Sequence, residues 1–313
     1  MILTVTLNPA VDKSYYIAEL TPDEVIRVDK ITRTAGGKGI NVAKIAKLLG
    51  NEVVATGFLG GENGKYVHDF LENAGICSCF IKSPAATRTC VNVNDIKNKQ
   101  QTVLLEPGSV ISHYLQEKFV KHYKNLIKDC NAVVLGGSLP EGIDKINFYP
   151  RLISLAKKEG KIVVLDTSGD TLRAGIDACP TIIKPNREEI SSYLGRNIET
   201  IEDIVAAAKE IHAKGTEIVI VSLGKDGAVF VLKDKVYRGT TPKIKVVNTV
   251  GCGDSLVAGF LTGLEKNYDI IDTIKLAMAV STANALSDEI GYFDSKVLED
   301  LLLKVDAFEI GQV

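Results

Sequence analysis

Short apolar runs alternate along the chain with segments whose apolar residues have helical spacing. The runs are rich in β-branched residues and suit strands buried on both faces of a sheet: residues 1–7, 53–59, 132–135, 161–165, 181–183 and 218–221. The helical segments alternate with them: residues 40–49, 65–74, 113–128, 146–158 and 201–213. This alternation predicts an α/β fold in which helices flank a mostly parallel central sheet through right-handed crossovers.

Two segments break the alternation. Residues 12–34 and 87–106 contain shorter apolar runs, with the turn residues Asn94 and Asp95 between two of them. We predict that these runs form a small antiparallel sheet outside the main one. The alternative is a pair of surface hairpins without a role in function.

Composition narrows the classes of protein. The chain has 313 residues, of which 45% are hydrophobic and 24% charged, and a formal net charge of −2. Because it has no basic block, we expect no nucleic-acid partner. No apolar run approaches the roughly 18 residues that a membrane helix needs, and residues 1–7 lack the features of a signal peptide. We therefore expect a cytoplasmic protein without a membrane partner, whose scattered cysteines stay reduced and bind no metal.

A glycine turn and a carboxylate stand together in residues 248–260, where a short strand gives way to an apolar helix. Gly251 and Gly253 let an anion approach the backbone, and successive N–H groups at a helix start attract a phosphate. Cys252 is small enough to keep its own N–H usable. The helix start is expected to lower the pKa of its thiol and the nearby carboxylate of Asp254 to raise it, so we expect a moderately reactive thiol. Asp254 would repel a phosphate unless a metal intervenes or the carboxylate takes a proton in the reaction. Alternatively, Asp254 caps the helix.

A second glycine turn precedes the helix predicted at 40–49. Gly36 and Gly37 permit close approach to the backbone. Lys38 supplies a point charge for a phosphate, and Asn41 offers a donor and an acceptor to a hydroxyl group. The spacing is not that of a Walker A loop. The alternative is an ordinary turn with a solvated lysine.

Other polar residues follow predicted strands or lie in the second sheet. Asp12 and Ser138 come after strands, at the sheet edge where open α/β folds place ligands. Arg88 and Arg27 lie in the segments of the second sheet, and an arginine can hold a phosphate with two parallel hydrogen bonds. Turn capping for Ser138 and a solvated strand charge for the arginines remain alternatives.

Loop residues after two later strands complete the candidate set: Lys184, Asn186, Glu189, Ser222, Gly224 and Gly227. Asn186 could equally cap a helix, with Glu189 as a charge in its first turn. The glycine-spaced loop that ends the set is weak evidence by itself.

Together these motifs resemble the ribokinase-like (PfkB) carbohydrate kinase family. The two glycine turns match the family's two signatures, and the spacing of Asn186 and Glu189 matches its Asn-x-x-Glu motif, so the resemblance covers essentially the whole chain. It implies a ribokinase-like three-layer sandwich forming a single domain over residues 1–313. The second sheet, drawn from about 12–34 and 87–106, would be a lid over the sugar.

The resemblance also implies roles for the candidate residues. Asp254 would be the catalytic base beside an anion hole formed by the N–H groups of Gly251, Cys252 and Gly253, although the family usually has Ser, Ala or Gly where this chain has Cys252. Substrate would be bound by Asp12, Gly36, Gly37, Lys38, Asn41, Arg88, Ser138 and Arg27, with Lys38 and Arg88 on its phosphate. ATP would be bound by Lys184, Asn186, Ser222, Gly224 and Gly227, and Mg²⁺, through water, by Asn186 and Glu189.

The activity that the resemblance implies is ATP-dependent phosphorylation of a ketohexose phosphate, in an enzyme that pairs with a second copy through its lid. The sequence resembles the hexose-phosphate kinases of the family, with tagatose 6-phosphate as the first substrate and fructose 1-phosphate as the alternative. A sugar-phosphate-binding regulator without catalysis is a second hypothesis, against which the intact Asp254 argues. A dinucleotide oxidoreductase is disfavoured, because no Gly-x-Gly-x-x-Gly follows the first strand.

Overall fold

The central sheet of the computed structural model, which describes residues 1–313, has eleven strands. Its middle is parallel and contains β1 (Ile2–Thr6), β4 (Val53–Leu59), β9 (Ala132–Gly136), β10 (Ile162–Asp166), β11 (Ile182–Ile183) and β12 (Ile218–Ser222). Short strands β5 (Cys77–Ser78) and β6 (Ile81–Lys82) pair in parallel with β4. Antiparallel strands extend the other edge: β13 (Ala228–Leu232), β14 (Lys235–Thr240) and β15 (Asp306–Gln312). The mostly parallel sheet is thus confirmed.

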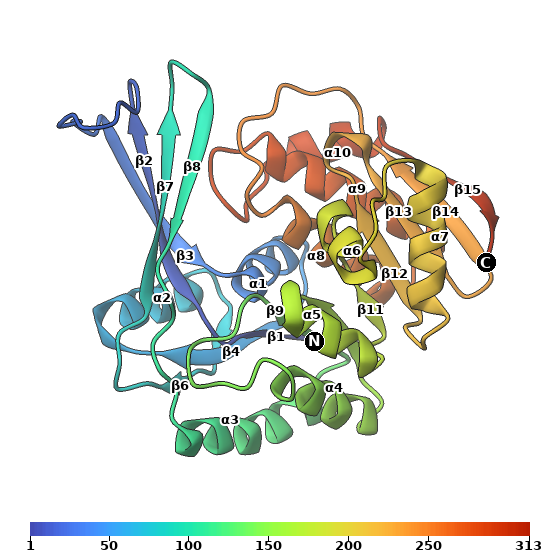
Figure 1. Cartoon of the computed structure of the whole chain (residues 1–313), viewed down its shortest axis with the longest axis horizontal. Helices are drawn as coiled ribbons and strands as arrows, with labels where there is room; N and C mark the ends of the chain where they lie inside the picture. Colours follow the sequence, from blue (N-terminus) through green and yellow to red (C-terminus); the bar gives the residue numbers. More distant parts are fainter.

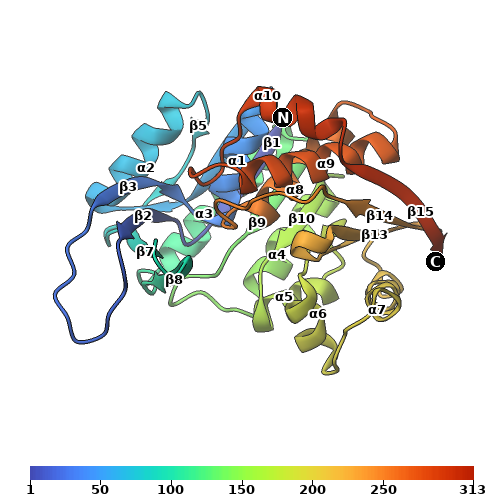
Figure 2. The same cartoon turned by 90° about the horizontal axis from the view of Figure 1, so that it is seen from above.

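Helices cover both faces of this sheet and make three layers (Figure 2). One face carries α1 (Lys38–Leu48), α2 (Gly61–Asn73), α8 (Cys252–Glu265), α9 (Ile270–Ala285) and α10 (Ser295–Leu302). The other carries α3 (His113–Leu126), α4 (Phe148–Lys158), α5 (Gly169–Asp177), α6 (Arg187–Leu194) and α7 (Ile201–His212). Successive side chains of a strand point to opposite faces, so Ile2 packs in the first layer's core and Leu3 in the second's.

A second sheet of four strands projects from the central body (Figure 1). It contains β2 (Ala10–Ile17), β3 (Lys30–Gly36), β7 (Arg88–Asp95) and β8 (Gln100–Leu105), in the order β3-β2-β7-β8. Each hairpin is antiparallel as predicted, whereas the central pair, β2 and β7, is parallel. Both strands start at the central body and run outward, which explains the parallel pairing. We call this sheet the lid.

The remaining differences from the sequence prediction concern weak patterns. The apolar residues at 28–31 predicted a strand of the lid. The strand observed there, β3, begins later, at Lys30, and is exposed over most of its length. The helices α5 and α10 and the strands β5, β6 and β15 were not predicted, and α6 was considered only as the helix that Asn186 would cap. Each of these helices has only eight or nine residues, too short for a clear apolar periodicity. The short strand expected just before α8 is wrong, because residues 241–251 contain no strand. No helix has the length and apolar character to cross a membrane.

Candidate active site

Helix α8 begins at a partly exposed turn that no side chain caps, and in which the N–H of Cys252 donates a long hydrogen bond of 3.4 Å to the backbone oxygen of Thr249. Gly251 is the N-cap residue, with φ of 84°. A Cβ atom at Gly253 would lie 2.9 Å from Nζ of Lys184, so the glycine lets this ammonium group reach the first turn. The positive end of the helix dipole and a lysine therefore meet at one point, which suits a phosphate.

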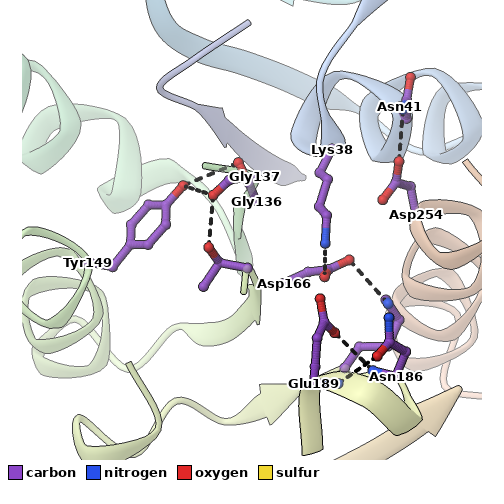
Figure 3. A network of polar contacts seen from close by, with 11 residues as sticks. Lys38, Asn41, Gly136, Gly137, Tyr149, Asp166, Asn186, Glu189 and Asp254 are labelled. Carbon is purple, nitrogen blue, oxygen red and sulfur yellow. Dashed lines mark hydrogen bonds and ion pairs between the residues drawn. The ribbon is translucent and has the colours of Figure 1, made fainter. Parts of the chain in front are cut away.

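Asp254 lies in this first turn with its side chain buried. It accepts a hydrogen bond of 2.8 Å from Nδ2 of Asn41, which α1 contributes (Figure 3). Burial raises the pKa of Asp254 to about 6, and the negative charge of Asp166 adds to this, against the opposite effect of Lys38. Because Asp254 caps no helix, the capping alternative is not observed. A carboxylate with this pKa can accept a proton near neutral pH.

A second carboxylate beside Asp254, Asp166, was not predicted from the sequence. It ends strand β10, is buried, and pairs with Nζ of Lys38 at 2.6 Å and with Nζ of Lys184 at 3.4 Å (Figure 3). Burial alone would raise its pKa, but the two ammonium groups outweigh burial and hold the pKa below its ordinary value. The signal was available, since Asp166 directly follows an apolar run just as Asp12 follows the first strand.

Asn186 and Glu189 form a capping box at the start of α6. The backbone N–H of Asn186 donates to Oε2 of Glu189 at 2.9 Å, and the N–H of Glu189 donates to Oδ1 of Asn186 at 2.8 Å. The helix cap that was the alternative role for Asn186 is therefore present. It does not exclude a ligand role, because the carboxylate of Glu189 faces the same network as Lys38 and Asp166 (Figure 3).

The glycine-spaced loop lies beside this capping box. Ser222 forms a parallel bridge with Asn186, and its N–H donates to the backbone oxygen of Pro185 at 3.0 Å. Gly224 is exposed and has φ of 57°. Gly227 is buried, and a Cβ atom there would lie 2.1 Å from the backbone oxygen of Gly239. Gly227 thus lets the loop pack against β14, while Ser222 and Gly224 face outward next to the α6 start.

Asp12 and the first glycine turn meet at the base of the lid. A Cβ atom at Gly36 would lie 2.0 Å from Oδ2 of Asp12, so only glycine leaves room for this carboxylate. Gly37 has φ of 117° and is the N-cap residue of α1. Burial raises the pKa of Asp12 to about 6, although the positive charges of Lys44 and Arg88 lower it. Asp12 is thus a poorly solvated carboxylate in the lid strand β2, able to accept hydrogen bonds from hydroxyl groups.

Arg88 starts β7 in the lid and lines a small hollow together with Asn8, Thr87 and Ser109. Its guanidinium donates to the backbone oxygen of Glu106 at 2.8 Å and to that of Asn8 at 3.2 Å, and Nε is buried without a hydrogen-bond partner. Nδ2 of Asn8 donates to Oγ of Ser138 at 3.3 Å. Asn8 therefore connects Arg88 to Ser138.

The three cations predicted to bind the substrate do not lie together in the structure. Arg27 is exposed in the segment between β2 and β3, at the end of the lid that is far from the central sheet (Figure 1). Lys38 contacts Asp166, whereas Arg88 contacts Asn8 and Glu106, so the two cations expected on one phosphate belong to different groups of residues.

The pKa of the Cys252 thiol differs from the sequence-based expectation. Burial raises its pKa, and the charge of Asp254 adds to this as predicted, so the lowering expected from the helix start does not prevail. The sulfur lies 3.5 Å from Nδ2 of Asn284, a buried residue of α9 that the sequence did not single out. Nδ2 of Asn284 also donates to the backbone oxygen of Val250 at 3.0 Å, and its Oδ1 accepts from the N–H of Gly291 at 3.1 Å. Asn284 thereby holds the turn that begins α8.

Comparisons with known proteins agree with this geometry. The model of the pfkB family carbohydrate kinases matches residues 5–292. A tagatose-6-phosphate kinase of Staphylococcus epidermidis is 36% identical over 313 residues, which are 99% of this chain and 100% of that protein.

Two solved structures are similar over nearly the whole chain. The phosphofructokinase-2 of Escherichia coli, in complex with substrates and products, superposes with a TM-score of 0.89 at 26% identity, covering 96% of this chain and 98% of that one. A protein of Thermotoga maritima described as a possible 1-phosphofructokinase gives a TM-score of 0.89 at 26% identity, covering 99% of both chains.

Proposed function

This chain belongs to the pfkB family of carbohydrate kinases, and we propose that it transfers the γ-phosphoryl group of ATP to a primary hydroxyl of a ketohexose phosphate. Tagatose 6-phosphate is the acceptor we propose first, and the products are tagatose 1,6-bisphosphate and ADP. The observation that carries the proposal is Asp254, a buried carboxylate with a raised pKa next to an uncapped helix start. The alternative acceptor is fructose 1-phosphate, the substrate class named by the Thermotoga maritima relative's description.

In the proposed mechanism, Asp254 accepts the proton of the attacking hydroxyl group. Asn41 orients this carboxylate through the 2.8 Å hydrogen bond. The N–H groups of Gly251, Cys252 and Gly253 stabilise the charge on the transferring phosphoryl group. Such transfer depends mostly on positioning and electrostatic stabilisation, which preorganised N–H groups supply.

The two lysines on Asp166 are assigned to the same transferring group. Lys184 lies beside Gly253, and Lys38 shares its carboxylate partner, so both can turn toward a phosphate at the helix start. Ser222 and Gly224 are assigned to the nucleotide phosphates and ribose, with Gly227 as a packing residue of that loop.

Mg²⁺ fits the carboxylates near the nucleotide site as an ion held through water. The chain offers no group of three acidic, histidine or cysteine ligands for a closed metal cage. Oδ2 of Asp166 is buried with Lys184 as its ion-pair partner at 3.4 Å, and Glu189 lies nearby in the network, so these carboxylates suit contact through water. Magnesium commonly keeps several waters and takes its other ligands from phosphates. When bound, it would neutralise charge on the nucleotide phosphates, with Glu189, Asn186 and Asp166 orienting its waters.

We assign the phosphate of the acceptor sugar to the hollow at the base of the lid. Arg88, with an unpartnered Nε, lines it together with Thr87 and Ser109, and Ser138 is linked to it through Asn8. Asp12 and Asn41 are assigned to the sugar hydroxyls. Gly36 and Gly37 keep the space around Asp12 open. Arg27 is assigned no contact with the sugar within its own chain.

The substrate is tested by ADP release with Mg-ATP and a panel of acceptors: tagatose 6-phosphate, fructose 1-phosphate, fructose 6-phosphate and the unphosphorylated sugars. We expect the highest kcat/KM with tagatose 6-phosphate. Arg88→Ala should raise the KM for the phosphosugar about ten- to a hundredfold, since a hydrogen bond to a charged group contributes on the order of 1.5–3 kcal/mol.

The same variant shows whether Arg88 acts on the phosphate of the sugar or on activity in general. Arg88→Ala should lose most of the preference for phosphorylated over unphosphorylated sugar, while the KM for ATP stays within about twofold. Lys38→Ala is the matched comparison and should lower kcat more than it raises the phosphosugar KM. An unchanged preference in Arg88→Ala would remove this residue from the phosphate site.

We also propose that the lid pairs with a second copy. The lid exposes large apolar side chains on the edge strands β3 and β8: Ile31, Val103, Leu104 and Leu105. Unpaired apolar edge strands commonly mark association surfaces. Sedimentation velocity should give a dimer for wild type and a monomer for Leu105→Glu. A monomeric wild type at micromolar concentration would contradict the proposal.

A further inference from the structure

Lys44 of α1 is a buried lysine that the proposed mechanism does not use; its side chain is among the least exposed charged groups of the chain. Its Nζ donates to Oγ1 of Thr34 at 3.1 Å and to the backbone oxygen of Ile290, and lies 5.3 Å from the ring centre of Phe70. These partners are neutral. Burying an ammonium group costs several kcal/mol, which these hydrogen bonds and the nearby carboxylates have to offset.

The partners of Lys44 come from elements that lie far apart in the sequence. Thr34 is in β3 of the lid, and Ile290 is in the segment that follows α9. The next residue, Gly291, has φ of 68°, and a Cβ atom there would lie 3.2 Å from Nζ of Lys44 and 3.4 Å from Oδ1 of Asn41. Lys44 and Asn41 are three residues apart on one face of α1, so both face this turn.

A continuous set of hydrogen bonds leads from that turn to the start of α8. The N–H of Gly291 donates to Asn284 at 3.1 Å, and Asn284 donates to the backbone oxygen of Val250 at 3.0 Å, one residue before the N-cap Gly251. Lys44 therefore connects the lid strand to the anion hole without touching a substrate position.

We propose that Lys44 is a positioning residue for the transfer step: its ammonium group fixes the 290–291 turn between the lid and α1, and through Asn284 fixes the turn that forms the anion hole. This inference rests on the proposed kinase activity. It adds a physical link between the lid, which would close over the sugar, and the helix start that would receive the phosphoryl group.

The positive charge of Lys44 also affects the pKa of Asp12, at the base of the lid. The charged groups that face it are Glu289 of the turn, Asp12 of β2 and Asp254 of α8. Burial lowers the pKa of Lys44 to about 8 although these carboxylates raise it, and Lys44 is the first of the charges that lower the pKa of Asp12. Loss of the ammonium charge should therefore make Asp12 harder to ionise.

The test compares Lys44→Met with wild type and with Lys47→Met, a partly exposed lysine near the end of the same helix. Lys44→Met should lower kcat about ten- to a hundredfold, the scale expected when catalytic groups are misplaced by about 1 Å. The acid limb of its kcat/KM for the phosphosugar should move to higher pH, because Asp12 loses a neighbouring positive charge. Lys47→Met should match wild type in both.

Lys44→Arg keeps a charge at every accessible pH and supplies the measurement if Lys44→Met does not fold. Wild-type kcat should fall above about pH 8, as Lys44 loses its proton, and Lys44→Arg should keep its rate there. The unfolded chain holds this proton up to its ordinary pKa of 10.5, so between about 8 and 10.5 the folded state gains stability from this group as the pH rises. The alkaline loss of rate should therefore occur without a loss of Tm.

Two results would overturn the inference. One is a folded Lys44→Met with wild-type kcat and an unmoved acid limb, which would leave Lys44 a packing residue. The other is an alkaline limb that is the same in wild type and Lys44→Arg. A wild-type enzyme without turnover on any acceptor would instead contradict the proposed kinase function, so the two failures are distinguishable.

Discussion

Asp254→Asn is expected to lower kcat by roughly two to four orders of magnitude, while the KM values for ATP and phosphosugar change little. The amide has nearly the same shape and keeps a group beside Asn41, but it cannot accept the proton of the attacking hydroxyl. Burial and the charge of Asp166 give the wild-type carboxylate a pKa of about 6, so wild-type kcat should fall as the pH drops below that value. The measurement is steady-state kinetics from pH 5 to 8.

Stability distinguishes loss of the base from loss of the fold. The folded pKa of Asp254 lies above its ordinary value of 3.8, so between 3.8 and about 6 the folded state holds a proton that the unfolded chain releases. This group therefore stabilises less as the pH rises through that window, and at pH 7 the buried charge is a cost. Asp254→Asn should unfold at the same or a higher temperature at pH 7. Near-wild-type turnover in this folded variant would exclude Asp254 as the base.

Asp166→Ala is expected to reduce the free energy of unfolding by about 3–5 kcal/mol, the range for removing one partner of a buried ion pair. The cost arises at Lys184, which is 6% exposed and would be left without its carboxylate. Lys38, whose side chain is 35% exposed, can turn toward solvent and should add little. Urea unfolding at pH 7 without ligands measures the difference.

A matched double variant separates the cost of breaking the ion pair from the cost of the cavity that alanine leaves. Asp166→Ala combined with Lys184→Met should be more stable than Asp166→Ala alone, because no unpaired charge remains buried. If the two substitutions destabilise additively, Asp166 and Lys184 are not coupled, and the proposed arrangement of cations around the phosphoryl site loses its basis.

The sequence predicted the parts of the fold that follow strong periodicity. The strand at 53–59 coincides with β4, because a buried parallel strand is apolar along its whole length. The start of α8 was found at the residues where it occurs, since glycine tolerates the left-handed conformation that the N-cap residue Gly251 adopts before the apolar helix. In contrast, β3 was misplaced because its exposed residues carry no apolar alternation.

The site was harder to predict where contacts join distant segments. Asp166 gave the same signal as Asp12, a carboxylate after a buried strand, but its partners are Lys38 and Lys184, which the sequence separates widely. Asn284 and Lys44 lie inside helices, where a polar residue reads as an ordinary surface position. The motif matches predicted that Arg88 and Lys38 bind one phosphate, but Arg88 contacts Glu106 whereas Lys38 pairs with Asp166.

The most direct test of the proposed phosphoryl transfer is to measure ADP and sugar bisphosphate in the same reaction, with Mg-ATP and tagatose 6-phosphate as substrates and Asp254→Asn as the matched control. The account predicts one bisphosphate for each ADP with wild type, and formation of both slower by two to four orders of magnitude with the variant. ADP released at an equal rate without sugar, or bisphosphate formed at the wild-type rate by folded Asp254→Asn, would contradict it.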